Sequence, residues 1–348
     1  MDRITVPLFY LATITPLLLV AAGVVLGGVW PWLAVAYMLF ATVALDTLMP
    51  VAAIPTAAHE ADQAEFPAAD SLLVILGVIT LLALPVLTLA IAGSSDLSLG
   101  ARIATFLAAS FWFGQVSHPA AHELIHRPRR MFWLGMACYT CLLFGHHASS
   151  HRLVHHRHVA SNKDPNTARL GEGFYRFLLR AWPGSIVQGY QAERALRATA
   201  KQPGPNPYAA YGGGAVACLA LGFLLAGWPG VLVWLGFGLQ AGAQILLSDY
   251  VQHYGLSRPA LPNGKRAPVA MAHSWNAPHL FSSALMLNAT RHSDHHAHPS
   301  RGYASLSLPP EAPLLPWPLP LAAMIALYPP LWRRRMRPLV TRWSIPQP

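Results

Sequence analysis

The chain has little charge. Only 11% of its 348 residues are Asp, Glu, Lys or Arg, whereas 54% are hydrophobic. Soluble domains carry about 25% charged residues, so this composition argues against a soluble globular protein. The few basic residues are also unevenly placed, because Arg3 and Arg102 are the only ones before residue 127. This asymmetry is typical of a membrane protein with basic segments on one side, and it argues against nucleic-acid binding.

Cysteine is scarce as well. The three cysteines, Cys138, Cys141 and Cys218, lie in apolar stretches, and only the first two are spaced as C-x-x-C. A rubredoxin-like iron centre is held by four thiolates, so this chain cannot hold one. We interpret the three cysteines as small core side chains of a reduced protein.

Long apolar runs are abundant, and about 20 apolar residues suffice to cross a bilayer. The pattern predicts an all-α integral membrane protein forming a single domain over residues 1–348. Shorter apolar stretches at 131–145 and 313–330 are expected to be re-entrant or interfacial. Six transmembrane helices are predicted, at about 6–28, 31–49, 71–93, 100–120, 208–227 and 230–250. The first run is longer than the apolar core of a signal peptide, so we interpret it as a span.

Basic residues predict the orientation of these spans. The short loops near residues 29, 94 and 228 carry no Lys or Arg apart from Arg102 at the edge of one of them. The strongly basic segments are 127–207, 252–278 and 331–348. Basic loops face the cytoplasm, and six spans place both termini on one side. We therefore expect a multi-pass membrane protein with both termini in the cytoplasm.

Histidines form four clusters near the cytoplasmic ends of the predicted spans. An i, i+4 pair on a helix, such as His122 with His126 or His151 with His155, directs two imidazoles toward one point. Imidazole suits iron, zinc and copper. The clusters supply nine residues: His122 and His126 in HELIH, His151, His155 and His156 in HRLVHH, His253 in DYVQHYG, and His292, His295 and His296 in RHSDHH. Nine exceed what one metal can take, so the pattern predicts a dinuclear site with four or five nitrogens per metal.

Two other metal-binding functions fit less well. The sequence HELIH matches the HExxH motif of zinc proteases, in which the Glu is a general base. Such a protease needs one further ligand, which leaves the two triple-histidine clusters unexplained. A metal transporter needs ligands along the path across the membrane, whereas these histidines gather on one face.

The histidine motifs stand in a longer pattern, "HELIH", "HRLVHHRHVASNKDP", "DYVQHYGL" and "SWNAPHLFSSALMLNATRHSDHHAHPSRGYASL". Over residues 31–340 this pattern resembles the membrane alkane 1-monooxygenase family, within the histidine-rich di-iron superfamily of fatty acid desaturases and hydroxylases. The resemblance implies six transmembrane helices and a cytoplasmic di-iron site. The implied ligands of the two irons are His122, His126, His151, His155, His156, His253, His292, His295 and His296. The chain departs from the family pattern at Ser150, Val154 and Thr290, which leaves these ligands intact.

The resemblance also implies an activity. The family uses O₂ as co-substrate to hydroxylate the terminal carbon of alkanes or alkyl chains, giving primary alcohols. Its electrons come from a rubredoxin or ferredoxin-type donor and that donor's reductase. Two related activities remain as alternatives for this chain. They are side-chain hydroxylation of alkylbenzenes, as in xylene-type hydroxylases, and fatty acid desaturation.

Residues around the clusters have predicted supporting roles. Ligating imidazoles commonly donate their second N–H to a carboxylate, and Glu123, Asp249 and Asp294 are placed for this. The histidines outside the pattern, for which roles at the surface or beside the ligands are expected, are His59, His118, His146, His147, His158, His273, His279 and His298. Aromatic residues that could line or block an alkyl channel, or simply pack, are Trp32, Tyr37, Phe40, Phe111, Trp112 and Phe113. Arginines that could steer an acidic donor or bind anionic membrane lipid are Arg127, Arg129, Arg130, Arg152, Arg157 and Arg333–Arg335. Asp46 is expected to face the bundle or the interface, because a carboxylate in lipid is costly.

Overall fold

The computed structural model describes residues 2–48, 67–93, 95–201, 204–309 and 311–344. Within these ranges nearly all regular structure is helical. The β structure there is limited to two isolated bridges, Ala260 with Arg266 and Asn276 with Leu314. The prediction of an all-α protein is therefore confirmed.

Within the described ranges, four helices are long and apolar enough to cross a membrane: Val6–Leu26, Trp30–Leu48, Ala68–Ala92 and Pro207–His253. The first three match the first three predicted spans. They are formed by α1 (Asp2–Leu26), by the continuous run of α2 (Trp30–Ala36), η1 (Tyr37–Ala41) and α3 (Thr42–Leu48), and by α4 (Pro67–Ala92). Many of their apolar side chains are exposed, as at Val25 and Leu82, which are 80% and 63% exposed. Such surfaces suit lipid, and they mark the chain as a membrane protein.

The fourth predicted span is one helical run, Leu99–Ile125, that is not among those four helices. It consists of α5 (Leu99–Trp112), the π-helical turn η2 (Phe113–Ser117) and α6 (His118–Ile125). Ser98 caps its start, because its side chain accepts a hydrogen bond from the Ala101 N–H at 3.3 Å. The end of this run contains His122 of HELIH, and the neighbouring Leu124 and Ile125 are buried in the core.

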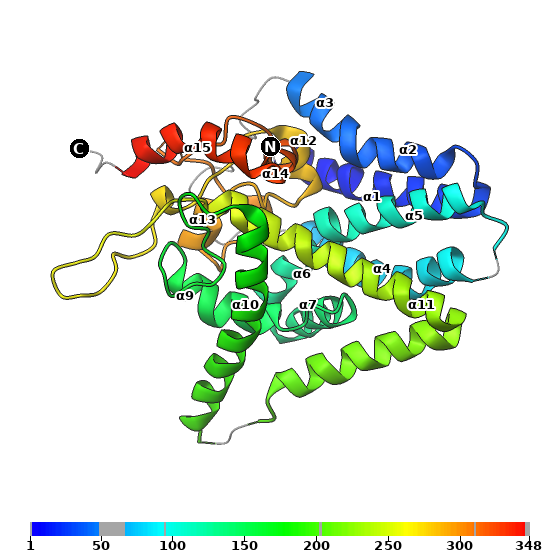
Figure 1. Cartoon of the computed structure of the whole chain (residues 1–348), viewed down its shortest axis with the longest axis horizontal. Helices are drawn as coiled ribbons and strands as arrows, with labels where there is room; N and C mark the ends of the chain where they lie inside the picture. The colour runs from blue at the N-terminus through cyan, green and yellow to red at the C-terminus, as the bar shows by residue number, and fades with distance from the viewer. Residues whose placement is uncertain (1, 49–66, 94, 202–203, 310, 345–348) are drawn as a thin grey trace.

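The fifth and sixth predicted spans are the two limbs of α11 (Pro207–His253). The helix breaks at Ala226 and Gly227, and Gly227 has φ +63°, which suits glycine. Pro229 follows and cannot donate a helical hydrogen bond. The GWPG sequence therefore turns the second limb back along the bundle (Figure 1).

The remaining helices are shorter or more polar. They are α7 (Arg129–Cys141), α8 (His147–Ser150), η3 (His151–His155), α9 (His156–His158), α10 (Phe174–Ala198), η4 (Met271–His273), α12 (Leu280–Leu285), α13 (His292–Ala297), η5 (Tyr303–Ser305), α14 (Leu319–Ala326) and α15 (Pro329–Ser344). The two short apolar stretches of the sequence correspond to α7 and α14.

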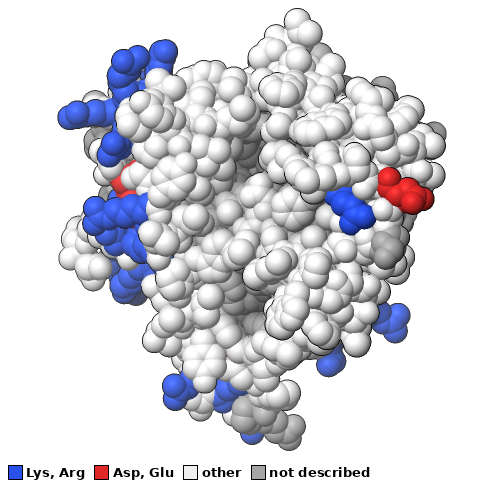
Figure 2. Space-filling view, turned by 45° about the vertical axis from the view of Figure 1, so that its right-hand side comes forward, with Lys and Arg blue, Asp and Glu red and all other residues white. Residues whose placement is uncertain are grey.

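The ends of the molecule differ. The α1–α2 and α4–α5 connections and the break in α11 lie at one end, and α9, α13 and α15 lie at the other (Figure 1). Figure 2 shows a face of the bundle that is almost free of charge, with Lys and Arg gathered toward its edges and a hollow along its middle. The histidine-bearing elements are therefore separated from the end that carries the short loops.

Asp46 shows how a carboxylate is kept inside this apolar bundle. It is 4% exposed and accepts hydrogen bonds from the backbone N–H groups of Phe281, at 2.7 Å, and Ser282, at 3.2 Å. These donors begin α12, so Asp46 joins α3 to the start of that helix. The expectation that Asp46 faces the bundle is confirmed.

Candidate metal centre

The nine predicted histidines converge from four separate segments into two neighbouring groups. The five-histidine group contains His122, His126, His151, His156 and His295. The four-histidine group contains His155, His253, His292 and His296. Within each group the potential ligand nitrogens all lie within 4.8 Å of one another. The groups adjoin, because the ring centres of His156 and His296 are 4.6 Å apart.

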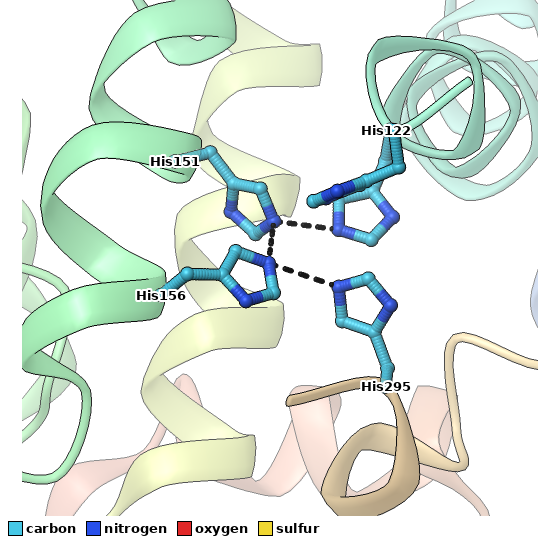
Figure 3. A group of neighbouring side chains, drawn as sticks. His122, His151, His156 and His295 are labelled. Carbon is cyan, nitrogen blue, oxygen red and sulfur yellow. Dashed lines mark hydrogen bonds between the residues drawn. The ribbon is translucent and has the colours of Figure 1, made fainter. Parts of the chain in front are cut away.

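Four imidazoles of the five-histidine group, those of His122, His151, His156 and His295, face a common point (Figure 3). The Nε2 atom of His151 lies 2.7 Å from Nε2 of His122 and 2.9 Å from Nε2 of His156. The Nε2 atom of His295 lies 3.1 Å from that of His156.

The four-histidine group has the same arrangement. The Nε2 atom of His292 lies 2.9 Å from that of His253 and 3.0 Å from that of His296. His155 joins them, with its ring centre 4.9 Å from the ring of His253 and 4.8 Å from that of His296.

These short nitrogen–nitrogen distances fit a bound cation better than hydrogen bonding. Each imidazole nitrogen has one site in the ring plane, occupied either by a hydrogen or by a lone pair. His151, His156 and His292 each present one Nε2 atom to two other nitrogens, so a single hydrogen bond leaves one contact unsatisfied. A shared metal ion satisfies all the lone pairs at once, and the donor set therefore fits metal binding.

Burial keeps most of these imidazoles neutral, which is the form that binds a metal. The pKa values of His151, His292 and His296 are lowered well below 6.5, first by burial and then by the neighbouring histidines. His155 differs. Burial lowers its pKa, but the adjacent Asp164 carboxylate outweighs this and raises the pKa above its ordinary value.

A π-helical turn decides how HRLVHH is divided between the groups. In η3 the N–H of His156 bonds to the carbonyl of His151, so residues five apart align. His151 therefore pairs with His156, and His155 turns into the other group. The prediction that His151 and His155 point at one metal is wrong, because it assumed α-helical spacing. The i, i+4 pairs His122 with His126 and His292 with His296 do share a group.

Asp164 is the carboxylate that contacts a predicted ligand most directly. Its Oδ2 atom is 2.8 Å from Nδ1 of His155, and the side chain of Thr167 and the backbone N–H of Asn166 hold it in place. Both His155 and Asp164 are buried. Sequence reasoning missed Asp164, although it stands in the NKDP segment directly after the second histidine cluster.

The three predicted supporting carboxylates make their hydrogen bonds elsewhere. Glu123 lies 3.7 Å from Nδ1 of His122, and its hydrogen bond comes from the Tyr303 backbone N–H. Asp249 accepts from the Asn166 side chain at 2.7 Å. Asp294 organises the loop that follows α13, where its partners are His298, Arg301 and Ser307. The structure thus places all three near the groups without a hydrogen bond to a predicted ligand among the described residues.

The other histidines that the structure describes lie outside both groups. His118, His146 and His147 are buried close by, and His147 stacks 4.9 Å from the ring of His151. His298 pairs with Asp294 at 2.8 Å. His59 falls outside the described residues.

A cavity of about 230 Å³ connects the apolar bundle with both groups. His122 and His151 of the five-histidine group and His292 of the four-histidine group belong to its wall. Aliphatic residues of η1, α11 and α14 add to this wall, among them Met38, Leu39, Ile245, Leu247, Leu319, Ala323 and Met324, and Leu327 follows α14 directly. An apolar ligand in this cavity would therefore reach the histidines.

The predicted channel aromatics separate into three kinds. Phe111 lines the cavity. Trp112 and Phe113 are fully buried core residues, and Tyr37 packs edge-on against Phe281. Trp32 and Phe40 point outward, 48% and 64% exposed.

Comparison with known proteins adds to this geometry. The sequence profile of the family described as "Fatty acid desaturase" matches residues 98–312, which include all nine histidines. The chain belongs to the fatty acid desaturase family. The matched residues include the helical run of α5, η2 and α6 and every element that supplies one of the nine histidines.

Several similar proteins are alkane 1-monooxygenases. The chain is 33% identical to alkane 1-monooxygenase of Ectopseudomonas oleovorans, over 64% of this chain and 57% of the relative. It is also 33% identical to alkane 1-monooxygenase 1 of Alcanivorax borkumensis, over 69% of this chain and 61% of the relative. These matches confirm the predicted resemblance. The chain thus spans about three-fifths of the length of these curated relatives.

A less similar relative matches over a longer stretch. The hydroxylase component of xylene/toluene monooxygenase from Pseudomonas putida is 27% identical, over 89% of this chain and 82% of its own length.

Proposed function

We propose that this protein is a di-iron monooxygenase that hydroxylates the terminal methyl group of alkanes or alkyl chains to a primary alcohol. The observation that carries the proposal is the apolar cavity, because its wall includes histidines of both groups. The similarity to alkane 1-monooxygenases supports the same reaction.

The proposed cofactor is a pair of iron ions, one for each histidine group. His122, His126, His151, His156 and His295 would hold one ion, and His155, His253, His292 and His296 the other. When bound, the irons supply the redox chemistry that activates O₂. The chain's own residues hold the ions, and Asp164 orients the His155 ring through Nδ1.

The reaction needs electrons that the chain cannot store by itself. One oxygen atom of O₂ enters the terminal C–H bond and the other leaves as water, which consumes two electrons and two protons. The three cysteines do not form a rubredoxin-like centre, so a separate rubredoxin or ferredoxin-type protein and its reductase would supply the electrons. Burial of the four-histidine group suggests that the donor approaches the more accessible five-histidine group.

The substrate would bind mainly by the burial of its alkyl chain. Each buried CH₂ group contributes about 0.8 kcal/mol. The aliphatic cavity wall and the lipid-facing helices suit a substrate that arrives from the membrane. The cavity would hold the terminal methyl near His122, His151 and His292 and exclude bulk water from it.

We further propose that six segments cross the bacterial inner membrane and that the histidines and both termini face the cytoplasm. The segments are the four apolar helices, with α11 counted as two limbs, together with the Leu99–Ile125 run. Their short connections lie at the end of the molecule opposite α9, α13 and α15, which supports this topology (Figure 1). A C-terminal green fluorescent protein fusion should fluoresce, and an alkaline phosphatase fusion should be inactive. The reverse pattern would contradict the orientation.

A second candidate is a side-chain hydroxylase of alkylbenzenes. The long match to the xylene/toluene monooxygenase component favours it. The description of the matching family favours a fatty acid desaturase, but the similar proteins described above are monooxygenases. Metal transport has no comparable observation in its favour.

The test is product analysis in membranes or cells that contain this chain and a rubredoxin with its reductase. Octane, hexadecane and p-xylene are supplied, and gas chromatography identifies the products. We expect 1-alkanols as the main products, and none from the His292→Ala variant. His158→Ala is the matched control, because His158 belongs to neither group, and it should keep activity. Methylbenzyl alcohol alone would support the second candidate, alkenes would support a desaturase, and no product would reject both hydroxylases.

A further inference from the structure

Amide side chains interrupt the apolar wall of the cavity. Gln240, Gln244, Ser248 and Gln252 are spaced four residues apart on α11, which places them on one helix face, and all four line the cavity. Gln115 of η2 joins them there. An alkane cannot pair with any of these groups, so a group that the protein itself leaves unpaired would stay unpaired beside an alkane.

Three of these polar side chains form hydrogen bonds within the protein. Ser248 donates to the Gln252 side-chain oxygen at 2.9 Å, and the Gln252 amide donates to the Ala289 carbonyl at 2.7 Å. Gln244 donates to the Ser110 carbonyl at 2.9 Å and thereby joins α11 to α5. These three residues therefore have structural hydrogen bonds.

Gln115 is different. Its side-chain oxygen Oε1 is buried and has no hydrogen-bond partner among the described residues. It lies next to Gly114, on which the Gln244 side chain packs. Gln240, one turn before Gln244, also lines the cavity. Since buried acceptors are nearly always paired, the Gln115 oxygen points to a ligand with a donor group.

The position of Gln115 and the charged residues of the cavity wall indicate what kind of donor group the ligand carries. Gln115 is seven residues before His122, which corresponds to roughly 10 Å along a helix. No Lys or Arg lines the cavity in the part of the chain that the structure describes, and Asp249 is the one carboxylate in its wall. An anionic head group would thus be buried without a partner, whereas a neutral hydroxyl would pair with the amides.

We propose that Gln115, with Gln240, recognises a neutral hydroxyl group on the substrate. The preferred substrate class would then be alkyl chains that carry a hydroxyl at one end and a free methyl at the other. This inference rests on the proposed function, because the methyl is hydroxylated by the same reaction. One atom of O₂ enters its C–H bond to give an α,ω-diol, and the other atom becomes water with two electrons and two protons from the external donor system.

The test compares decane with 1-nonanol, which have equal numbers of non-hydrogen atoms. The full chain in detergent, with its iron and a rubredoxin system, is assayed for kcat/KM with each, as wild type, Gln115→Leu and Gln240→Leu. In Gln115→Leu the ratio of kcat/KM for 1-nonanol to that for decane should fall on the order of tenfold, as for one lost hydrogen bond. Gln240→Leu should lower this ratio as well. Gln191→Leu, an exposed glutamine of α10, is the matched control and should leave the ratio unchanged.

A second readout does not depend on turnover. The thermal unfolding midpoint Tm of the full chain with its iron is measured with and without 1-nonanol, in the absence of an electron donor. We expect 1-nonanol to raise Tm of the wild type and of Gln191→Leu more than that of Gln115→Leu.

The outcomes separate the two proposals. Suppose that both substrates are hydroxylated, but that Gln115→Leu and Gln240→Leu have the same kcat/KM ratio and the same Tm shift as the wild type. The hydroxyl recognition is then refuted and the proposed function stands. If neither substrate reacts, yet 1-nonanol raises Tm only when Gln115 is present, the binding proposal stands and the proposed function fails.

Discussion

At the scale of single residues, Asp164 and Asp294 are two buried carboxylates near histidines with different tasks. Asp164 bonds to His155 Nδ1, whereas Asp294 bonds to Arg301 and Ser307 outside the groups. A carboxylate on the second imidazole nitrogen raises ligand basicity and fixes the ring, and its loss typically costs 10- to 100-fold in metal affinity.

We therefore expect Asp164→Asn to weaken iron binding by about 10- to 100-fold at one of two sites. Titration of metal-free protein with Fe(II) under anaerobic conditions measures this. Asp294→Asn serves as the comparison. It should lower thermal stability, and its Fe(II) affinities at the two sites should stay within a few-fold of the wild-type values. Equal iron affinities in Asp164→Asn and the wild type would refute a role for Asp164 in holding His155.

His253 tests whether the four-histidine group holds its own ion. It is fully buried at the end of α11, and its Nε2 atom lies 2.9 Å from that of His292. We expect reconstituted wild-type protein to contain two irons per chain, one for each group. His253→Ala should retain about one iron and lose turnover, because four ligands become three.

Metal analysis together with product formation checks this. The matched control is His279→Ala, since His279 lies outside both groups. One iron per chain in fully reconstituted wild type, or two irons and normal turnover in His253→Ala, would contradict a dinuclear centre.

At the scale of elements, local departures from α-helix geometry place the site. The π-turn η3 assigns His151 and His156 to one group, and the break in α11 returns its second limb so that it ends at His253. Gly227 has φ +63° and ψ −151°, a backbone conformation that is nearly confined to glycine.

Gly227→Ala should therefore destabilise the fold by about 1–3 kcal/mol. Gly212→Ala is the matched control on the same helix, because no atom lies within 4 Å of a Cβ added there. It should leave stability unchanged or raise it by up to about 1 kcal/mol. Thermal unfolding in detergent compares the two variants. Equal Tm values for both would mean that the turn tolerates a side chain and that Gly227 does not set the break.

At the scale of the whole molecule, basic side chains gather around the histidine end. Arg129 and Arg130 begin α7, three and four residues after His126, and are exposed. Arg152 lies over the Phe132 ring, 4.8 Å from its centre. Arg152 and Arg127 help to lower the pKa of His126, after burial and His122, so their positive field reaches the five-histidine group.

We expect this field to steer an acidic electron donor. Charge reversal at both Arg129 and Arg130 should raise the donor concentration needed for half-maximal rate several-fold, and wild-type rates at limiting donor should fall with salt, since exposed charges are screened beyond about 10 Å at 0.1 M. Chemically reduced single turnover should be unaffected. Arg194→Glu, near the end of α10, is the control for a general charge effect. Donor dependence that ignores both salt and charge reversal would favour lipid as the partner of these arginines.

The amino-acid sequence by itself determined the class of protein and the residues of the candidate centre. Apolar runs of about 20 residues predict membrane helices because lipid cannot satisfy backbone hydrogen bonds, and three of the four apolar helices follow those runs directly. The nine histidines were found because each cluster is local in sequence. Six crossings, the orientation and a single domain over the chain stay predictions.

Only the tertiary structure decided how the histidines are shared and what surrounds them. His155 and His156 are neighbours in sequence, yet they belong to different groups, because a π-turn aligns residues five apart. Asp164 reaches His155 through a loop whose course depends on Asn166 and Thr167. The cavity forms between helices distant in sequence, so no local pattern predicts that Gln115 and α11 line one space. Local periodicity thus identifies the ligands, whereas long-range packing decides their partners.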